Sequence, residues 1–287
     1  MLVLGGSASS GLDIPIARLL GAEHAQVATT SFPDGEIKVR IPESVGGDVV
    51  IVQSTYQPQE RHLFELLLIA DYLREKGCRI TAVVPYLGYA RQDRSFIPGE
   101  AVSIRTVLNT MRGVGITRLV TVNPHKEASL GHFDGEVTVV NAIAPLARMV
   151  KDRLVDPFVL APDAGGLELA KRASGLLGCE YASIDKRRDA EGRVSIVGTH
   201  GGGLGGKDVV IFDDIISTGG TIELAARFAY GQGARSVSAA GVHLVMAGGA
   251  RERLRDANVA TVFGTNTMPS QGAEIADIGP EIAECLK

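Results

Sequence analysis

The chain has 287 residues and a formal net charge of −4, and 45% of its residues are hydrophobic. This length allows two domains of ordinary size, each with its own core. The acidic balance, with no basic run longer than the triplet at 186–188, argues against a nucleic-acid surface. The three cysteines match no zinc or redox spacing, and no segment resembles a secretion signal or membrane anchor. We therefore expect a cytoplasmic protein that binds neither nucleic acid nor membrane.

Short apolar runs alternate with amphipathic helical runs along the chain, which is the βαβ pattern of a doubly wound, mostly parallel sheet. The fold class predicted is therefore α/β. We predict strands near residues 49–53, 80–84, 117–122, 157–161, 181–184, 208–212, 236–242 and 259–263. We predict helices near residues 59–76, 102–112, 142–153, 166–177, 222–230 and 280–287.

The first candidate motif is SFPDGE at 31–36, a turn that precedes the strand-like run EIKVRI. Asp34 and Glu36, on either side of Gly35, are sufficient to cap a hairpin and do nothing else. Alternatively, these acids and an exposed Phe32 hold a nucleotide, with the phenyl ring stacked on the base. The residues alone leave both interpretations open.

The second motif is PYLGYARQDRSFIPGE at 85–100, which follows a predicted strand and carries Arg91 and Arg94. Arginine forks suit phosphate oxygens, and the segment is long enough to move over a ligand. A solvated loop whose arginines pair with neighbouring acids explains the same residues equally well.

Three further groups of residues also follow predicted strands. His125 lies in NPHKE, where a structural role is the more common one, and His132 competes with it for any catalytic role. Asp163 lies in APDAGG; the turn could be purely geometric, yet an acid here is a natural Mg²⁺ ligand beside a triphosphate. The triplet KRR at 186–188 is typical of a solvated face, but it could also neutralise charge on a transferring phosphoryl group.

The most informative stretch is VVIFDDIISTGGT at 209–221, a buried strand followed by adjacent carboxylates, Asp213 and Asp214, and a small-residue loop. Ligands of open α/β sheets bind beyond the carboxyl ends of the strands. A phosphate at the loop would meet free N–H groups and the positive end of the next helix. Adjacent carboxylates accept hydrogen bonds from a vicinal diol or hold hydrated Mg²⁺. The stretch therefore predicts a ribose 5-phosphate site, and its alternative is a loop that only caps the helix.

Two pairs of segments point to an internal duplication. DVVIVQST at 48–55 resembles DVVIFDDI at 208–215, and KGCRITAVVPY at 76–86 resembles QGARSVSAAGV at 232–242. Chance similarity between apolar strands could explain either match, but two matches in the same order and spacing favour duplication. We predict two similar domains, residues 1–142 and residues 143–287, with the final helix able to pack back on the first.

Five motifs, FPDGE, GYARQDR, PDAGG, DKRR and DDIISTGGT, together resemble signatures of the ribose-phosphate pyrophosphokinase family, and of its archaeal-type members in particular. DDIISTGGT alone is shared with phosphoribosyltransferases, whereas the five together are specific. The resemblance covers nearly the whole chain and implies two phosphoribosyltransferase-like domains. It also implies Mg²⁺-dependent transfer of the pyrophosphoryl group of ATP to the 1-hydroxyl of ribose 5-phosphate, which yields AMP and 5-phosphoribosyl 1-pyrophosphate for nucleotide biosynthesis.

The resemblance further implies a role for each matching residue. Transition-state stabilisation would fall to Lys186 and Arg188, and Arg188 would also contact the sugar phosphate. The metal contacts would come from His125 and Asp163. The ATP contacts would come from Phe32, Asp34, Gly35, Glu36, Arg91 and Gln92. The ribose 5-phosphate contacts would come from Asp213, Asp214, Ser217, Thr218, Gly219, Gly220 and Thr221.

An ATP site that a neighbouring subunit completes, as in this family, would make the protein a homo-oligomer, at least a dimer. Two departures from the family pattern lie in or beside the candidate site. Ser217 stands where many members have an acid, which leaves the hydrogen bonding to the sugar phosphate open. Asn123-Pro124-His125 stands where Asp-Leu-His is usual, which weakens any metal role for residue 123.

Two other functions remain open at this point. A phosphoribosyltransferase would share the 213–221 loop, but it predicts one sheet domain with a base-binding hood. A catalytically silent regulatory subunit of the same family would bind the same ligands without turnover.

Overall fold

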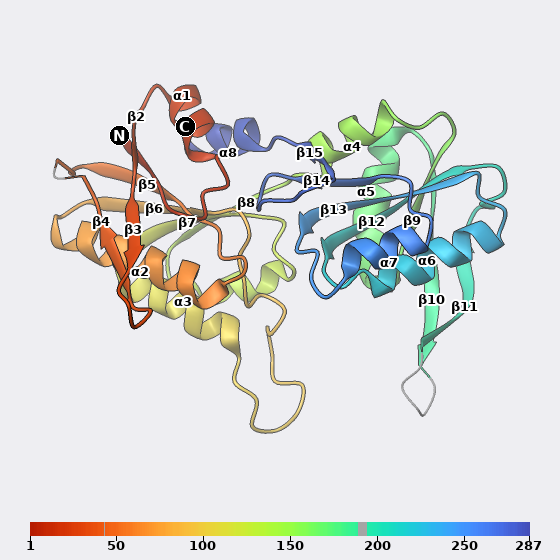
Figure 1. The fold of residues 1–287 in the computed structure, drawn as a ribbon, viewed down its shortest axis with the longest axis horizontal. Coiled ribbons are helices and arrows are strands. Elements are labelled where there is room, and N and C mark those ends of the chain that lie inside the picture. The colour runs from red at the N-terminus through yellow and green to blue at the C-terminus, as the bar shows by residue number, and fades with distance from the viewer. Residues whose placement is uncertain (43, 189–193) are drawn as a thin grey trace. The chain divides into compact units, whose positions relative to one another are not determined.

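The computed structural model describes residues 1–42, 44–188 and 194–287, and for residues 186–188 and 194–201 it describes the backbone only. Figure 1 shows two compact units, each with its own sheet. Unit 1 comprises Met1–Asn141, Asn266–Met268 and Ile278–Lys287. Unit 2 comprises Ala142–Thr265 and Pro269–Asp277.

Unit 1 is built on a six-stranded parallel sheet of order β2-β1-β5-β6-β7-β8, with a separate antiparallel hairpin β3-β4. Helices α2 and α3 cover one face and α1 and α8 the other (Figure 1). The strands are β1 (Leu2–Gly5), β2 (Glu23–Gln26), β3 (Ala28–Ser31), β4 (Ile37–Arg40), β5 (Asp48–Val52), β6 (Arg79–Val84), β7 (Ile116–Val122) and β8 (Glu136–Val140). The helices are α1 (Asp13–Leu20), α2 (Gln59–Glu75), α3 (Ser103–Gly113), the 3₁₀ helix η1 (Glu127–His132) and α8 (Gly279–Leu286).

Unit 2 has a seven-stranded sheet of order β11-β10-β9-β12-β13-β14-β15, parallel except for the β10–β11 pair. Helices α4 and α5 lie on one face and α6 and α7 on the other (Figure 1). The strands are β9 (Pro157–Ala161), β10 (Glu180–Arg188), β11 (Val194–Gly201), β12 (Asp208–Ile216), β13 (Ser236–Leu244), β14 (Val262–Thr265) and β15 (Glu274–Ala276). The helices are α4 (Ile143–Lys151), η2 (Ala164–Gly166), α5 (Leu167–Leu177), α6 (Gly220–Gly231) and α7 (Ala250–Asp256).

The two sheets share one topology once the hairpin β3-β4 and strand β11 are set aside. In each unit the second strand pairs on one side of the first strand, and the remaining strands follow on the other side. The repeated segments occupy equivalent places, since β5 matches β12 and β6 matches β13. The predicted α/β class with two similar parallel-sheet domains is therefore confirmed.

The periodicity of the sequence explains the helices that cover the sheets. In α2, Leu66, Ile69, Ala70 and Leu73 recur at helical spacing and are fully buried against unit 1. The strands beneath are rich in valine and isoleucine and are buried on both faces, as parallel sheets require. Each unit buries its own apolar cluster.

Several elements depart from the sequence prediction. The predicted strand at 259–263 begins later, at Val262, after α7 and a turn at 257–258. Strand β12 continues through both aspartates to Ile216, because β13 is equally long and pairs with it as far as Leu244. Elements absent from the prediction are β1, α1, β2, β3, η1, β8, η2, β11, α7 and β15.

The C-terminal helix α8 belongs to unit 1, where it contacts α1 and β8. Arg118 of β7 donates a hydrogen bond of 2.6 Å to the carbonyl of Cys285, in the last turn of the helix. The same guanidinium forms a 2.9 Å ion pair with Glu136 of β8. A cation at this end favours the helix because its last carbonyls carry partial negative charge. Across the described residues, no helix is both long and apolar enough to span a bilayer.

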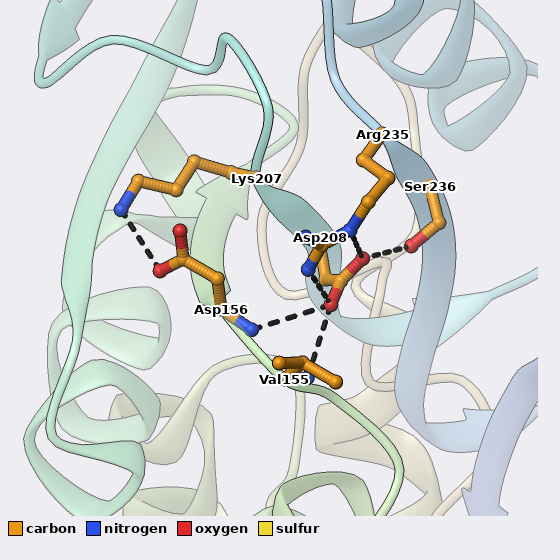
Figure 2. Close-up of polar contacts among 6 residues, drawn as sticks. All are labelled: Val155, Asp156, Lys207, Asp208, Arg235 and Ser236. Carbon is orange, nitrogen blue, oxygen red and sulfur yellow. Dashed lines mark hydrogen bonds and ion pairs between the residues drawn. The ribbon is translucent and has the colours of Figure 1, made fainter.

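At the start of β12, Asp208 joins three neighbouring strands (Figure 2). Its carboxylate accepts hydrogen bonds from the backbone N–H groups of Val155 and Asp156, at 3.0 and 3.3 Å, just before β9. It also accepts from Ser236 Oγ at 2.7 Å and from the guanidinium of Arg235, at the start of β13. The Arg235 guanidinium, helped by these other donors, holds the pKa of Asp208 far below its usual range despite burial. One carboxylate thus fixes β9, β12 and β13 relative to each other.

We expect Asp208→Asn to lower the free energy of unfolding by about 2 kcal/mol at pH 7, because the amide –NH₂ would face N–H donors in a buried place. Because the folded-state pKa of Asp208 is lowered, the wild-type advantage should be complete above the unfolded-state pKa of about 4. It should shrink as the pH falls below that value. Denaturant unfolding at pH 7 and at lower pH measures both effects. The control Asp256→Asn breaks an exposed pair with Arg255 and should change stability by less than about 0.5 kcal/mol.

Candidate active site

The strand order of unit 2 places its candidate site at the switch point between β9 and β12. The chain leaves these adjacent strands toward opposite faces, so the loops after them diverge and leave a crevice beyond the strand ends. β9 pairs with β12 only as far as Ile211, and then turns into the loop that carries Asp163. β12 runs on along β13 through Asp213 and Asp214. The two aspartates therefore lie past the last β9 pairing, on the side of the Asp163 loop.

The aspartate pair concentrates negative charge in a partly buried place. Asp213 Oδ1 accepts the N–H of Asp214 at 2.9 Å, and Asp214 Oδ1 accepts the N–H of Ile215 at 2.8 Å. Burial, and next the adjacent Asp214 carboxylate, raises the pKa of Asp213 well above its usual range, and Asp163 adds to the effect. A diol donor or a cation would relieve this charge, so the chemistry of these donors fits either ligand.

Asp163 has a definite structural task. Its Oδ1 accepts the N–H groups of Gly165 and Gly166 at 3.0 and 3.3 Å and so caps η2. Asp163 therefore has a structural role in this turn, and its role toward a metal stays a prediction. The cap also fixes the carboxylate at the end of β9, next to the aspartate pair of β12.

The loop that follows the aspartate pair is short, because β12 ends at Ile216 and α6 begins at Gly220 rather than at Ile222. The N-cap residue of α6 is Gly219, at φ 77°, and no side chain caps the helix. The interpretation in which the aspartates and hydroxyls only cap α6 is therefore wrong. The loop instead presents the N–H groups of a helix start, where an anion is favoured.

The neighbouring elements leave open space beside Gly220 and pack closely beside Gly219. A Cβ built on Gly220 meets no atom within 4 Å, whereas one on Gly219 would approach the Ala250 carbonyl oxygen to 3.4 Å. Arg253 of α7 donates to the Thr218 carbonyl and pairs with Glu223 of α6. The loop is therefore open beside Gly220, the first residue of α6.

The counterpart of this loop in unit 1 is filled by its own side chains. After β5, Gln53, Ser54 and Thr55 are at most 1% exposed. Ser54 Oγ donates to the Thr267 carbonyl at 2.6 Å, and Thr55 Oγ1 donates to the Tyr86 carbonyl at 3.0 Å. The described residues of unit 1 therefore provide no equivalent opening at the corresponding strand end.

In unit 1 the 31–36 turn lies at the tip of the hairpin β3-β4. Phe32 donates its N–H to the Glu36 carbonyl at 2.8 Å, and Gly35, at φ 95°, adopts a conformation that favours glycine. Asp34 and Glu36 are exposed, and the Phe32 ring is 49% exposed with Lys38 Nζ 6.0 Å from its centroid. The turn is thus well formed and presents its ring and both acids to solvent.

The segment at 85–100 is irregular and mostly exposed beyond Ala90. Gln92 Nε2 donates to the Arg94 carbonyl at 3.1 Å, and Glu100 accepts the N–H groups of Phe96 and Ile97. Arg94 lies over the Phe96 ring at 5.2 Å. Among the described residues, neither Arg91 nor Arg94 has an acidic partner, so the interpretation in which these arginines pair with neighbouring acids is not supported.

The remaining candidates fall in different places. His125 is partly buried in the loop between β7 and η1, and His132 is exposed at the end of η1. Lys186 and Arg188 lie at the end of β10, next to a register shift after Asp185, and their side chains lie outside the described part of the structure. No cluster of three or more potential metal ligands occurs among the residues that the structure describes.

Each unit therefore brings together its own group of the residues singled out in the sequence. Unit 2 joins Asp163 with the aspartate pair and the 217–221 loop. Unit 1 contains the 31–36 turn, the Arg91–Gln92 segment and His125. The sequence analysis missed Arg253, which had no motif around it and was identified only by its contact with the Thr218 carbonyl.

Comparison with known proteins defines the class of the fold and then the family. Residues 1–115 match the profile of the N-terminal domain of ribose phosphate pyrophosphokinase, and residues 139–276 match that of the phosphoribosyl transferase domain. The chain thus has the phosphoribosyltransferase-type fold in its second half.

Full-length relatives are more specific. The chain is 46% identical over 291 residues to ribose-phosphate pyrophosphokinase of Saccharolobus solfataricus, and 38% identical over 291 residues to that of Methanothermobacter thermautotrophicus. Both alignments cover 100% of each chain. The crystal structure of phosphoribosylpyrophosphate synthetase from Mycobacterium smegmatis superposes with a TM-score of 0.88 at 31% identity, over 99% of this chain and 97% of that one. The chain belongs to the ribose-phosphate pyrophosphokinase family.

The two glycines at the start of α6 should respond to alanine in opposite ways. Gly219→Ala adds a Cβ at φ 77° beside the Ala250 carbonyl and should lower the free energy of unfolding by about 1–2 kcal/mol. Gly220→Ala adds a Cβ in open space and should leave stability unchanged or raise it by about 0.5 kcal/mol. Denaturant unfolding of both variants makes the comparison, and an equal loss in both would contradict this geometry.

Proposed function

We propose that the protein is a ribose-phosphate diphosphokinase, which transfers the β,γ-pyrophosphoryl group of ATP to the 1-hydroxyl of ribose 5-phosphate. Its products would be AMP and 5-phosphoribosyl 1-pyrophosphate. The observation that carries this proposal is the uncapped start of α6 next to the paired carboxylates of β12, within a chain of this family. One end of this arrangement suits a phosphate and the other a sugar diol.

In unit 2 we assign ribose 5-phosphate to the loop before α6. The N–H groups of the first turn of α6, with the hydroxyls of Ser217, Thr218 and Thr221, would hold the 5-phosphate. Asp213 and Asp214 would accept hydrogen bonds from the sugar hydroxyls. Because Ser217 carries no charge, this loop adds no repulsion toward the phosphate where many relatives have an acid.

In unit 1 we assign ATP to the exposed segments. Phe32, Asp34, Gly35 and Glu36 would contact the adenosine, and Arg91 with Gln92 would complete the site. By the family resemblance a neighbouring subunit contributes to this site, so we propose a homo-oligomer that is at least a dimer. ATP as the donor also suits a cytoplasmic enzyme.

The proposed reaction uses Mg²⁺ bound with the triphosphate, where it would neutralise charge on the phosphate oxygens. His125 and Asp163 are the residues we assign to it. The scarcity of ready-made protein ligand clusters in the described residues fits Mg²⁺, which usually takes one or two protein groups plus substrate phosphates.

Chemically, the protein would act by alignment and charge. The 1-hydroxyl oxygen attacks the β-phosphorus and loses its proton to solvent. The bond between the β-phosphorus and the oxygen that bridges it to the α-phosphate breaks, and AMP leaves with that oxygen. Negative charge spreads over the equatorial oxygens, where Lys186 and Arg188 would stabilise it. This step needs no nucleophilic cysteine or serine. Closure of the 91–100 segment would keep water from competing with the sugar hydroxyl.

A phosphoribosyltransferase is the weaker alternative. It predicts one sheet domain with a hood, whereas this chain folds into two sheet units of the same topology. It also leaves the 31–36 turn and the 85–100 segment without a role. A catalytically silent regulatory subunit would share the fold, so an assay has to separate it from the active enzyme.

The decisive experiment measures AMP formed from ATP in the presence of Mg²⁺. We expect AMP only when ribose 5-phosphate is added. A protein that binds ATP but forms no AMP would be the silent subunit. Release of pyrophosphate from 5-phosphoribosyl 1-pyrophosphate on addition of a nucleobase, without AMP formation in the first assay, would instead indicate a phosphoribosyltransferase.

Gly220→Ala tests the proposed sugar site without a change in the fold. The new methyl group would lie in open space at the first residue of α6, without disturbing its neighbours. We expect the KM for ribose 5-phosphate to rise at least tenfold, about 1.4 kcal/mol, while the KM for ATP stays within twofold. Gly231→Ala, at the other end of α6 and also open to a Cβ, is the matched control and should change neither constant.

Lys186→Ala tests the proposed transition-state role. Turnover should fall a hundredfold or more, on the order of 3 kcal/mol, while the affinity for ATP changes little. Initial rates and ATP titration measure the two quantities separately. A collapse of ATP affinity with turnover intact would make Lys186 a ground-state binder.

A further inference from the structure

Helix α2 combines an apolar face with a polar beginning. Its later turns bury Leu66, Ile69 and Leu73 against the core of unit 1. Its first two turns instead direct three polar side chains, those of Glu60, Arg61 and Glu65, to segments that are distant in sequence. These contacts are side-chain hydrogen bonds, which the packing of α2 on the sheet does not require.

Glu65 and Arg61 hold the hairpin that carries the 31–36 turn. Glu65 is fully buried and accepts the Thr29 hydroxyl of β3 at 2.8 Å, together with the N–H of Ser7 at 2.8 Å. One turn earlier, Arg61 Nη1 donates to Ser31 Oγ at 2.9 Å. Ser31 is the last residue of β3 and directly precedes Phe32. The orientation of the turn at the tip of the hairpin is therefore fixed from α2.

Glu60 holds the segment that leads to Arg91 and Gln92. Its carboxylate accepts the Tyr89 hydroxyl at 2.8 Å. Tyr89 has φ 65°, a left-handed conformation that costs a non-glycine residue free energy and needs support from its surroundings. The Tyr89 carbonyl in turn accepts the Gln92 N–H at 3.1 Å. The bond to Glu60 thus supports the turn that directs Arg91 and Gln92.

From these contacts we infer that the first two turns of α2 position each of the two segments proposed to contact ATP, with Glu60, Arg61 and Tyr89 as positioning residues. The inference rests on the proposed function, which assigns ATP to these two segments. The inference adds a role for α2, a helix that contains none of the sequence motifs. Helix α2 thus holds each of two segments that lie more than fifty residues apart in the sequence. Each segment would be partly ordered before the nucleotide arrives.

The test removes one hydroxyl. Tyr89→Phe keeps the ring and loses the donor to Glu60, so the segment before Arg91 should lose its support. We expect the KM and the dissociation constant for ATP to rise about threefold to tenfold, the range for one hydrogen bond to an exposed carboxylate. The KM for ribose 5-phosphate and kcat should stay within twofold. The matched control is Tyr230→Phe, which removes a 2.8 Å hydroxyl bond to the Asn258 carbonyl in unit 2 and should change none of these constants.

A double-mutant cycle distinguishes positioning from general weakening. Glu60→Ala should raise the ATP constants as much as Tyr89→Phe does, and adding Tyr89→Phe to it should have no further effect. Glu60→Gln keeps an acceptor oxygen and should recover most of the loss. Fully additive effects, or equal losses for both substrates, would overturn the inference.

Calorimetric titration with ATP gives a readout that does not depend on turnover. If the wild type binds ATP and forms no AMP, the proposed reaction fails, but the variants still test the positioning role by their dissociation constants. If the wild type is active and Tyr89→Phe leaves both ATP constants unchanged, the positioning role fails alone. If the wild type does not bind ATP at all, both fail.

Discussion

The architecture of unit 2 depends on the carboxylate of Asp208. This carboxylate accepts hydrogen bonds from residues at the starts of β9 and β13, the two strands next to β12. It therefore aligns the starts of all three strands. β9 has five residues and β12 has nine, so strands that start together cannot end together. At about 3.3 Å per residue, the aspartate pair then lies roughly 7–10 Å beyond the last β9 pairing. The site exists because this register leaves part of β12 without a partner on one side.

The same topology has two outcomes in the two units. At the strand end after β12, adjacent carboxylates and an uncapped helix start leave charge and N–H groups for a ligand. At the strand end after β5, the side chains of Gln53, Ser54 and Thr55 form hydrogen bonds within the protein. Buried polar groups have to be satisfied in either case. Unit 1 satisfies them internally, which stabilises the loop and leaves no polar groups of these described side chains for a ligand.

The parts of the fold that were predictable from the sequence are those with long, regular patterns. The apolar run from Val209 to Phe212 indicates a buried strand, and the periodicity of α2 indicates a helix with one buried face. The repeated segments indicated that the two units share a topology. β1 and α1 were missed because LVLG is only four residues long and a loop rich in glycine and serine separates it from the helix. The length of β12 was not predictable either, since it depends on pairing with β13 rather than on its own residues.

The candidate site was predictable where residue chemistry and position coincide, as in the aspartate pair and the glycines at the start of α6. Its supporting contacts were not. Arg253 and Glu60 are ordinary surface residues in the sequence, and their partners, the Thr218 carbonyl and the Tyr89 hydroxyl, are distant along the chain. A pattern within one segment carries no information about such pairs. The capping interpretation was wrong because the length of β12, which depends on pairing with β13, could not be predicted. With β12 extended to Ile216, the cap position of α6 falls on Gly219, which has no side chain.

The two proposed substrate sites differ in how they are held. The loop before α6 is short and lies between a long buried strand and a helix, so its shape follows from the core of unit 2. The 31–36 turn and the Arg91–Gln92 segment are exposed, and side-chain bonds from α2 hold both. Such bonds contribute little free energy each, because water competes for exposed donors and acceptors. A site held this way can tighten when its ligand supplies further contacts, so the nucleotide segments, rather than the sugar loop, are the part of the protein able to respond to substrate.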